Sequence, residues 1–149
     1  MKIAALLSTL FGIGRAPAAG TVASLVALPF AWIILAHGGG VALGMASLIV
    51  LGIGIWSCGV YVRAMGREDP SECVIDELAG QWLACAFAPL SLWGFALAFI
   101  FFRLFDIAKP WPVSAMERLP GGYGVMMDDM LAGLIAGLLA LLAVHLGLV

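Results

Sequence analysis

Three long stretches of this chain carry no charged side chain, and they limit the fold more than any other feature of the sequence. They cover residues 16–62, 78–102 and 130–149. Charged residues make up 11% of the chain, against about a quarter in soluble domains, and the mean hydropathy is +1.13. Helices of this composition hide their apolar surface in a lipid bilayer, so we predict an all-α integral membrane protein.

The length of 149 residues predicts a single domain, 1–149. The first apolar run, 3–14, is too short to cross a bilayer core about 30 Å thick, so we expect a short interfacial or re-entrant helix there. Breaks are expected at the glycines of 37–40 and at 89–91. The remaining apolar segments predict a bundle of about five helices, at 21–36, 41–62, 72–88, 90–105 and 130–149. Residues 72–105 are alternatively a hairpin of two half-buried helices.

The charged residues gather in three islands between the apolar segments. Lys2 and Arg15 form the first, and the others lie at 63–77 and 103–129. Five crossings place all three islands on one face, while the opposite connectors contain no Lys or Arg. By the positive-inside rule that face is cytoplasmic. The net charge of −2 gives no indication of a nucleic-acid partner.

The pentapeptide Asp-x-Leu-Ala-Gly occurs twice, at 76–80 and 129–133, each time at the start of an apolar segment. Glycine one turn after each aspartate lets two helix backbones approach closely. Gly133 and Gly137 form a Gly-x-x-x-Gly face, which suits either the bundle interior or a homo-oligomer. We therefore expect four acids to converge at the cytoplasmic end of the bundle: Asp76, Glu77, Asp128 and Asp129.

A second group of charged residues lies between the two copies of the pentapeptide. Arg103, Asp106 and Lys109 are spaced three residues apart, so they share one face of a helix. Pro110 is expected to end this helix, and the glycine-rich residues 121–124 are expected to form a flexible loop leading to Asp128. The simplest interpretation of the three charges is an ion-pair ladder, but ionisable residues beside a membrane are functional candidates.

Clustered carboxylates offer oxygen ligands, which suit a hard divalent cation such as Mg²⁺. Arg103 and Lys109 are suitable partners for phosphate oxygens. A cation and basic side chains together neutralise the charge on a phosphoryl group during its transfer. The residues therefore indicate phosphate chemistry on a membrane-bound headgroup.

Four blocks of this sequence resemble the phosphatidylglycerophosphatase A family. They are residues 102–112, 121–133, 73–82 and 20–24 running into Leu28 and Pro29. The blocks occur in the family's order and extend over about residues 12–137. This sequence differs from the family pattern at Ala19 and Ala23, where the family usually has proline and glycine, respectively.

The resemblance implies a bacterial inner-membrane enzyme that removes the terminal phosphate of phosphatidylglycerophosphate to give phosphatidylglycerol, with Mg²⁺. On this basis the metal ligands are expected among Asp76, Glu77, Asp128 and Asp129. Asp106 is expected to be a ligand or the general base, so Asp106, Asp129 and Glu77 are the predicted catalytic residues. Arg103 and Lys109 are expected to bind phosphate, with hydroxyl donors from Thr21 and Ser24.

Two mechanisms and two other function classes stay open at the level of sequence. An activated water is expected to attack the phosphorus, with a covalent aspartyl-phosphate as the variant. The alternative function is a small membrane transporter or channel with an acidic cation site, which would favour charges near the bilayer midplane. A structural subunit whose acids pair with a partner is the third class.

Overall fold

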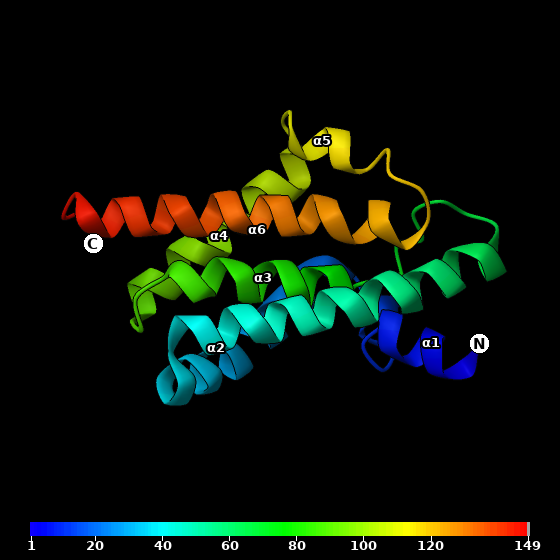
Figure 1. Ribbon diagram of the computed structural model, residues 1–149, viewed down its shortest axis with the longest axis horizontal. Helices are drawn as coiled ribbons and strands as arrows, with labels where there is room; N and C mark the ends of the chain where they lie inside the picture. Colours follow the sequence, from blue (N-terminus) through cyan, green and yellow to red (C-terminus); the bar gives the residue numbers. More distant parts are fainter. Residues whose placement is uncertain (149) are drawn as a thin grey trace.

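The computed structural model describes residues 1–148, and within that range the chain contains helices and connectors without any strand (Figure 1). This confirms the predicted all-α fold class. The elements are α1 Lys2–Ser8, the 3₁₀ turn η1 Ile13–Arg15, α2 Ala19–Met65, α3 Ile75–Phe87, α4 Leu92–Ala108, α5 Val113–Met116 and α6 Gly122–His145.

The 47-residue helix α2 reverses direction at Gly39, where φ is 74° and ψ is −179°. Figure 1 shows its first arm in blue and its second arm, from cyan to green, running back alongside. Only glycine adopts this backbone conformation readily, because any Cβ would clash. The predicted break at 37–40 is therefore confirmed, and it turns one apolar segment into two antiparallel arms.

Two helices, α2 and α6, are long and apolar enough to cross a membrane. The 13 residues of α3 and the 17 of α4 correspond to roughly 20 and 26 Å of helix. Both are shorter than a hydrocarbon core of about 30 Å. Helices at both predicted positions are confirmed, with bounds shifted by a few residues, whereas the count of five crossings is not established by helix length.

The prediction of a flexible loop at 121–124 is wrong, because α6 begins at Gly122 rather than near residue 130. A Cβ on Gly122 would lie 2.1 Å from the carbonyl oxygen of Ile55, and one on Gly124 would lie 2.3 Å from that of Leu119. These glycines serve close packing and not flexibility. As a consequence, Asp128 and Asp129 lie inside the helix, beyond its first turn.

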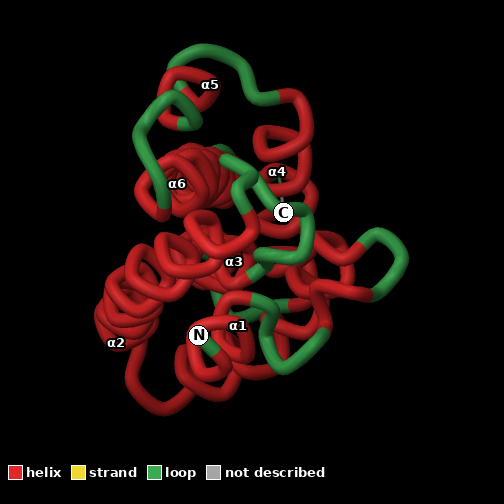
Figure 2. Tube along the Cα trace, turned by 90° about the vertical axis from the view of Figure 1, so that its right-hand side faces the viewer, coloured by secondary structure: helices red, strands yellow, loops and turns green. Residues whose placement is uncertain are grey.

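Helix α3 lies in the middle of the bundle, between α2 and α6 (Figures 1 and 2). A Cβ on Gly133 would lie 2.2 Å from the carbonyl oxygen of Gly80, so the glycines of the two pentapeptides meet, as predicted. A Cβ on Gly137 would lie 3.0 Å from the carbonyl oxygen of Ala84. The Gly-x-x-x-Gly face is thus used inside the bundle, where it packs α6 against α3.

Candidate active site

Three carboxylates from three different helices meet beside the contact between α3 and α6. Glu77 of α3, Asp106 of α4 and Asp129 of α6 each offer one oxygen, and these oxygens lie within 4.8 Å of one another. Glu77 is 8% exposed and Asp129 only 2%. Negative charges this close together in a buried place repel one another strongly unless a cation or a proton accompanies them.

Arg103 supplies part of the compensating charge. Its Nη1 lies 2.6 Å from Glu77 Oε2 and 2.6 Å from Asp106 Oδ2. The pairing with Asp106 is the one predicted from their spacing along the helix, and the bridge to Glu77 joins α4 to α3. One guanidinium faces three carboxylates, so the three-carboxylate group keeps an excess of negative charge.

One oxygen of Asp129 has no hydrogen-bond partner. Asp129 Oδ2 is fully buried and unpaired among the described residues, whereas buried carboxylate oxygens are normally satisfied. Leaving such an oxygen without a partner is costly, and a bound cation would remove that cost. The donor set consists of oxygens alone, which matches the preference of Mg²⁺. The side chains at this place therefore fit a hard divalent cation.

The first turns of α2 close one side of the three-carboxylate group. Ser24 Oγ donates to Glu77 Oε2 over 3.0 Å. A Cβ on Gly20 would lie 2.2 Å from Glu77 Oε1 and 3.3 Å from Arg103 Nη1. Gly20 lies in a matched family block, but sequence reasoning did not single it out as a site residue. The feature that could have indicated Gly20 is its lack of a side chain directly before the predicted site residue Thr21.

Lys109 forms a second ion-pair cluster. Its Nζ donates to Asp128 Oδ2 over 2.9 Å and also to Glu117 Oε1. Burial disfavours the charged ammonium, but Glu117 and Asp128 outweigh this effect and raise the pKa of Lys109 above its usual value. Sequence reasoning missed Glu117, which comes from the connector between α5 and α6.

Some of the predicted site residues lie in the three-carboxylate group or contact it, and others do not. Asp76 accepts a hydrogen bond from the backbone N–H of Glu77, and Asp128 is paired with Lys109. Neither belongs to the three-carboxylate group, in which Asp106 takes a place instead. Ser24 contacts Glu77, while Thr21 lines a cavity together with Arg103.

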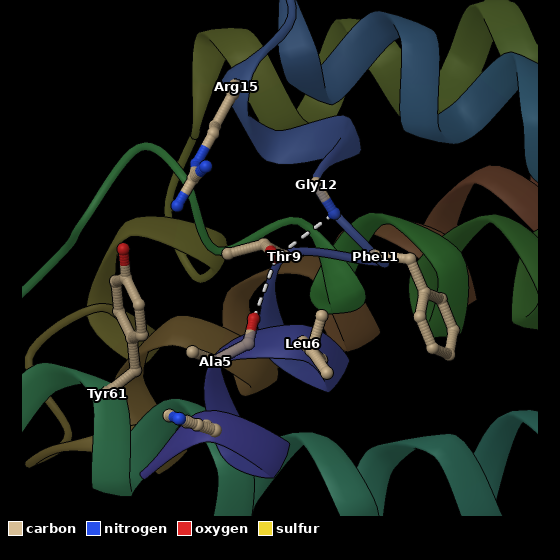
Figure 3. Close-up of a pocket in the computed structure, with 8 residues that line it drawn as sticks. Ala5, Leu6, Thr9, Phe11, Gly12, Arg15 and Tyr61 are labelled. Atoms are coloured by element: carbon tan, nitrogen blue, oxygen red, sulfur yellow. Dashed lines mark hydrogen bonds between the residues drawn. The ribbon is translucent and has the colours of Figure 1, made fainter.

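Three cavities are lined in part by charged residues. The first, of about 460 Å³, is lined by Thr21, Ser71 and Arg103, and Arg103 pairs with two carboxylates of the three-carboxylate group. A second, of about 560 Å³, lies beside Asp128 and is lined also by Arg63, Glu117 and Arg118. The third, at the N-terminus, is lined by Lys2, Arg15 and Tyr61, among others (Figure 3).

Two helices long and apolar enough to cross a membrane are consistent with a membrane protein, and its buried acidic group beside an arginine could hold a metal ion. The family model described as phosphatidylglycerophosphatase A matches residues 6–144. The chain belongs to this family, as the sequence blocks predicted.

Individual relatives agree with this assignment. Phosphatidylglycerophosphatase A of Escherichia coli K12 is 35% identical over 144 residues, which cover 94% of this chain and 83% of that protein. Phosphatidylglycerophosphatase A of Haemophilus influenzae is 35% identical over 134 residues, covering 88% and 82%. A putative phosphatidylinositol-3-phosphatase of Bacteroides thetaiotaomicron is 39% identical over 154 residues, covering 93% and 91%. No solved structure matches the chain.

Proposed function

We propose that this protein hydrolyses the terminal phosphate monoester of phosphatidylglycerophosphate, releasing phosphatidylglycerol and inorganic phosphate in bacterial phospholipid synthesis. Membership of the phosphatidylglycerophosphatase A family supports the substrate. The observation that carries the chemistry is the meeting of Glu77, Asp106 and Asp129 beside Arg103.

The cofactor is Mg²⁺, held by Glu77, Asp106 and Asp129. The unpaired oxygen of Asp129 and the all-oxygen donor set support this assignment. When bound, the ion neutralises negative charge on the phosphoryl oxygens and activates the attacking water. Asp76 and Asp128 directly precede Glu77 and Asp129 in the sequence. Asp76 holds the backbone at Glu77 by accepting its N–H, and Asp128 holds the Lys109 side chain in place.

The protein side chains orient the phosphate and move the protons. Arg103, at the wall of the 460 Å³ cavity, binds phosphate oxygens, and the Thr21 hydroxyl in the same cavity donates to them. Asp106, the least buried of the three acids, accepts the proton of the water that attacks phosphorus. The bond between phosphorus and the glycerol oxygen breaks, and that oxygen leaves with the proton that Asp106 has taken from the water. Lys109 does not line this cavity and pairs with Glu117 and Asp128, so in this proposal it fixes the end of α4 and does not carry the phosphate.

The reaction takes place at the cytoplasmic face of the inner membrane, with the chain crossing the bilayer several times. Two contacts between the charged islands support a common face: the backbone N–H of Val74 donates to the Ser8 carbonyl, and Arg103 pairs with Glu77. A transporter with a midplane cation site fits this arrangement less well, because the basic residues suited to phosphate gather with the acids.

The Bacteroides relative supports a second candidate substrate, the phosphate monoester of a phosphatidylinositol phosphate. One assay separates the candidates. Purified protein in detergent is incubated with short-chain phosphatidylglycerophosphate or phosphatidylinositol 3-phosphate, with Mg²⁺ or with a chelator, and released phosphate is measured. We expect Mg²⁺-dependent release from phosphatidylglycerophosphate. Release from the inositol lipid alone would favour the second substrate, and no release from either would reopen the transporter hypothesis.

A further inference from the structure

An apolar groove runs between the first arm of α2 and the start of α4. Leu25, Leu28 and Pro29 line it from α2, and Ala96 and Phe99 line it from α4, around a volume of about 420 Å³. Leu25 is 49% exposed, so the groove opens to the outside of the bundle. Its lining offers almost no polar atom with which water or a headgroup would bond.

Two packed aromatic side chains contribute to the wall of this groove. The rings of Trp32 and Phe95 meet edge to face, with centroids 5.1 Å apart, in the arrangement that aromatic pairs favour. The indole N–H of Trp82 donates to the Ala27 carbonyl over 3.0 Å and ties α3 to the same arm of α2. The groove is thus a feature of the packed bundle and not a gap between loosely held helices.

A second apolar hollow continues along α4 toward the three-carboxylate group. It has a volume of about 380 Å³ and is lined by Phe99, Ile100, Leu104 and Arg103. Phe99 lines both hollows. Arg103 lines this second hollow and also the polar cavity that contains Thr21. The surface along α4 therefore changes from apolar to polar at Arg103.

The dimensions match one leaflet of a bilayer. Leu92 in the groove and Arg103 in the second hollow are eleven positions apart along α4, a separation of roughly 16 Å. Half of the hydrocarbon core is about 15 Å. A molecule that places a phosphate at Arg103 and a long apolar chain along the groove is a phospholipid.

We propose that the groove along α2 and α4 holds one acyl chain of the lipid substrate, which enters sideways from the bilayer with its headgroup directed to Arg103. This inference rests on the proposed function, because it takes the ligand to be the phospholipid whose phosphate is removed. It assigns the substrate's route and orientation, and it makes the wall of the groove a determinant of chain-length preference.

The test compares a long-chain with a short-chain phosphatidylglycerophosphate in detergent micelles. Ala96→Trp fills the groove from α4, and Leu25→Trp fills it from α2. Leu138→Trp places the same side chain on the exposed face of α6, where Leu138 is 49% exposed, and serves as the matched control. We expect each groove variant to lose kcat/KM roughly tenfold on the long-chain substrate through steric overlap. Its kcat/KM on the short-chain substrate should stay within about twofold of the wild type.

Parallel losses on both substrates, or no loss on either, in a groove variant that elutes as folded protein would overturn the proposal. If one groove variant does not fold, the other decides, because they fill the groove from opposite walls. Failure of the proposed function itself gives a different result, since the wild type would then release no phosphate from either substrate.

Discussion

At the scale of single residues, Glu77 is the most closely held group of the site. Ser24 donates to Glu77 Oε2 over 3.0 Å, Arg103 lies 2.6 Å from the same oxygen, and the bare Cα of Gly20 stands against the other oxygen. A carboxylate held in this way is oriented before any ligand arrives, and such preorganisation contributes strongly to catalysis. The surroundings of Glu77 are therefore as important as the acid itself.

Gly20→Ala tests this close approach. The added Cβ would lie 2.2 Å from Glu77 Oε1, which is the movable end of a side chain, so the carboxylate shifts while the backbone stays in place. We expect phosphate release to fall roughly tenfold to a hundredfold, with the unfolding temperature in detergent nearly unchanged. Gly52→Ala is the control, because a Cβ there meets nothing within 4 Å. Equal activity of the two variants would contradict the role given to Gly20.

Arg103→Lys tests the bridge between Glu77 and Asp106. Lysine keeps the positive charge but lacks the planar fork that reaches two partners, so this change is not conservative at a bridging site. We expect a loss of about a hundredfold in kcat/KM for phosphate release. Lys2→Arg, on the N-terminal helix α1, controls for exchange of the basic residue type. Wild-type rates for Arg103→Lys would show that the bridging geometry is dispensable.

At the scale of the elements, the contact between α3 and α6 sets the distance between Glu77 and Asp129. The glycines of the two Asp-x-Leu-Ala-Gly copies make that contact, since a Cβ on Gly133 would lie 2.2 Å from the carbonyl oxygen of Gly80. Backbone atoms cannot move aside as a side-chain end can. The repeated pentapeptide therefore works through its glycines to bring two helices together, and through its neighbouring acids to build the site.

Gly133→Ala should force α3 and α6 apart. We expect a loss of about 1–3 kcal/mol in stability, the usual cost of overpacking, together with loss of activity because the carboxylates separate. Thermal unfolding in detergent and phosphate release are the measurements. Gly44→Ala is the matched control, because its Cβ would make only an ordinary contact, 4.0 Å from the Cβ of Ala86. An unfolding temperature for Gly133→Ala equal to that of the control would contradict the packing account.

Part of this arrangement could be predicted from the sequence. Apolar runs and the breaks between them predicted the helices, and the spacing of three residues predicted the ion pair of Arg103 and Asp106. The links from Ser24 to Glu77 and from Lys109 to Asp128 join residues 53 and 19 positions apart, and periodicity within one helix gives no information on such contacts. The early start of α6 was missed because its glycines were interpreted as loop formers, although they pack against α2 and the connector.

At the scale of the whole molecule, the reversal of α2 at Gly39 brings both ends of that helix to one side. The connector after α2 then meets the N-terminus, where the backbone N–H of Val74 donates to the Ser8 carbonyl over 2.8 Å. The basic and acidic islands become neighbours in this way. A common face for all islands is the physical basis of the proposed cytoplasmic site.

Labelling of single introduced cysteines tests this topology. The native cysteines Cys58, Cys73 and Cys85 are buried, so a membrane-impermeant maleimide should leave them unlabelled. We expect Glu68→Cys to be labelled only in inside-out vesicles, because the connector faces the cytoplasm. His37→Cys, near the reversal of α2, should be labelled only in right-side-out spheroplasts. Labelling of both positions from the same side would contradict the two-armed crossing of α2.

The central claim is that Glu77, Asp106 and Asp129 together bind the divalent cation on which activity depends. Binding of Mn²⁺, a spectroscopic substitute for Mg²⁺, to purified protein is measured by electron paramagnetic resonance in the absence of lipid substrate. Asp129→Asn is compared with the wild type and with Asp69→Asn on the exposed connector. We predict a bound ion in the wild type and in Asp69→Asn, and loss of that ion in Asp129→Asn, which replaces the unpaired buried carboxylate oxygen. Equal Mn²⁺ binding by Asp129→Asn and the wild type would contradict the account.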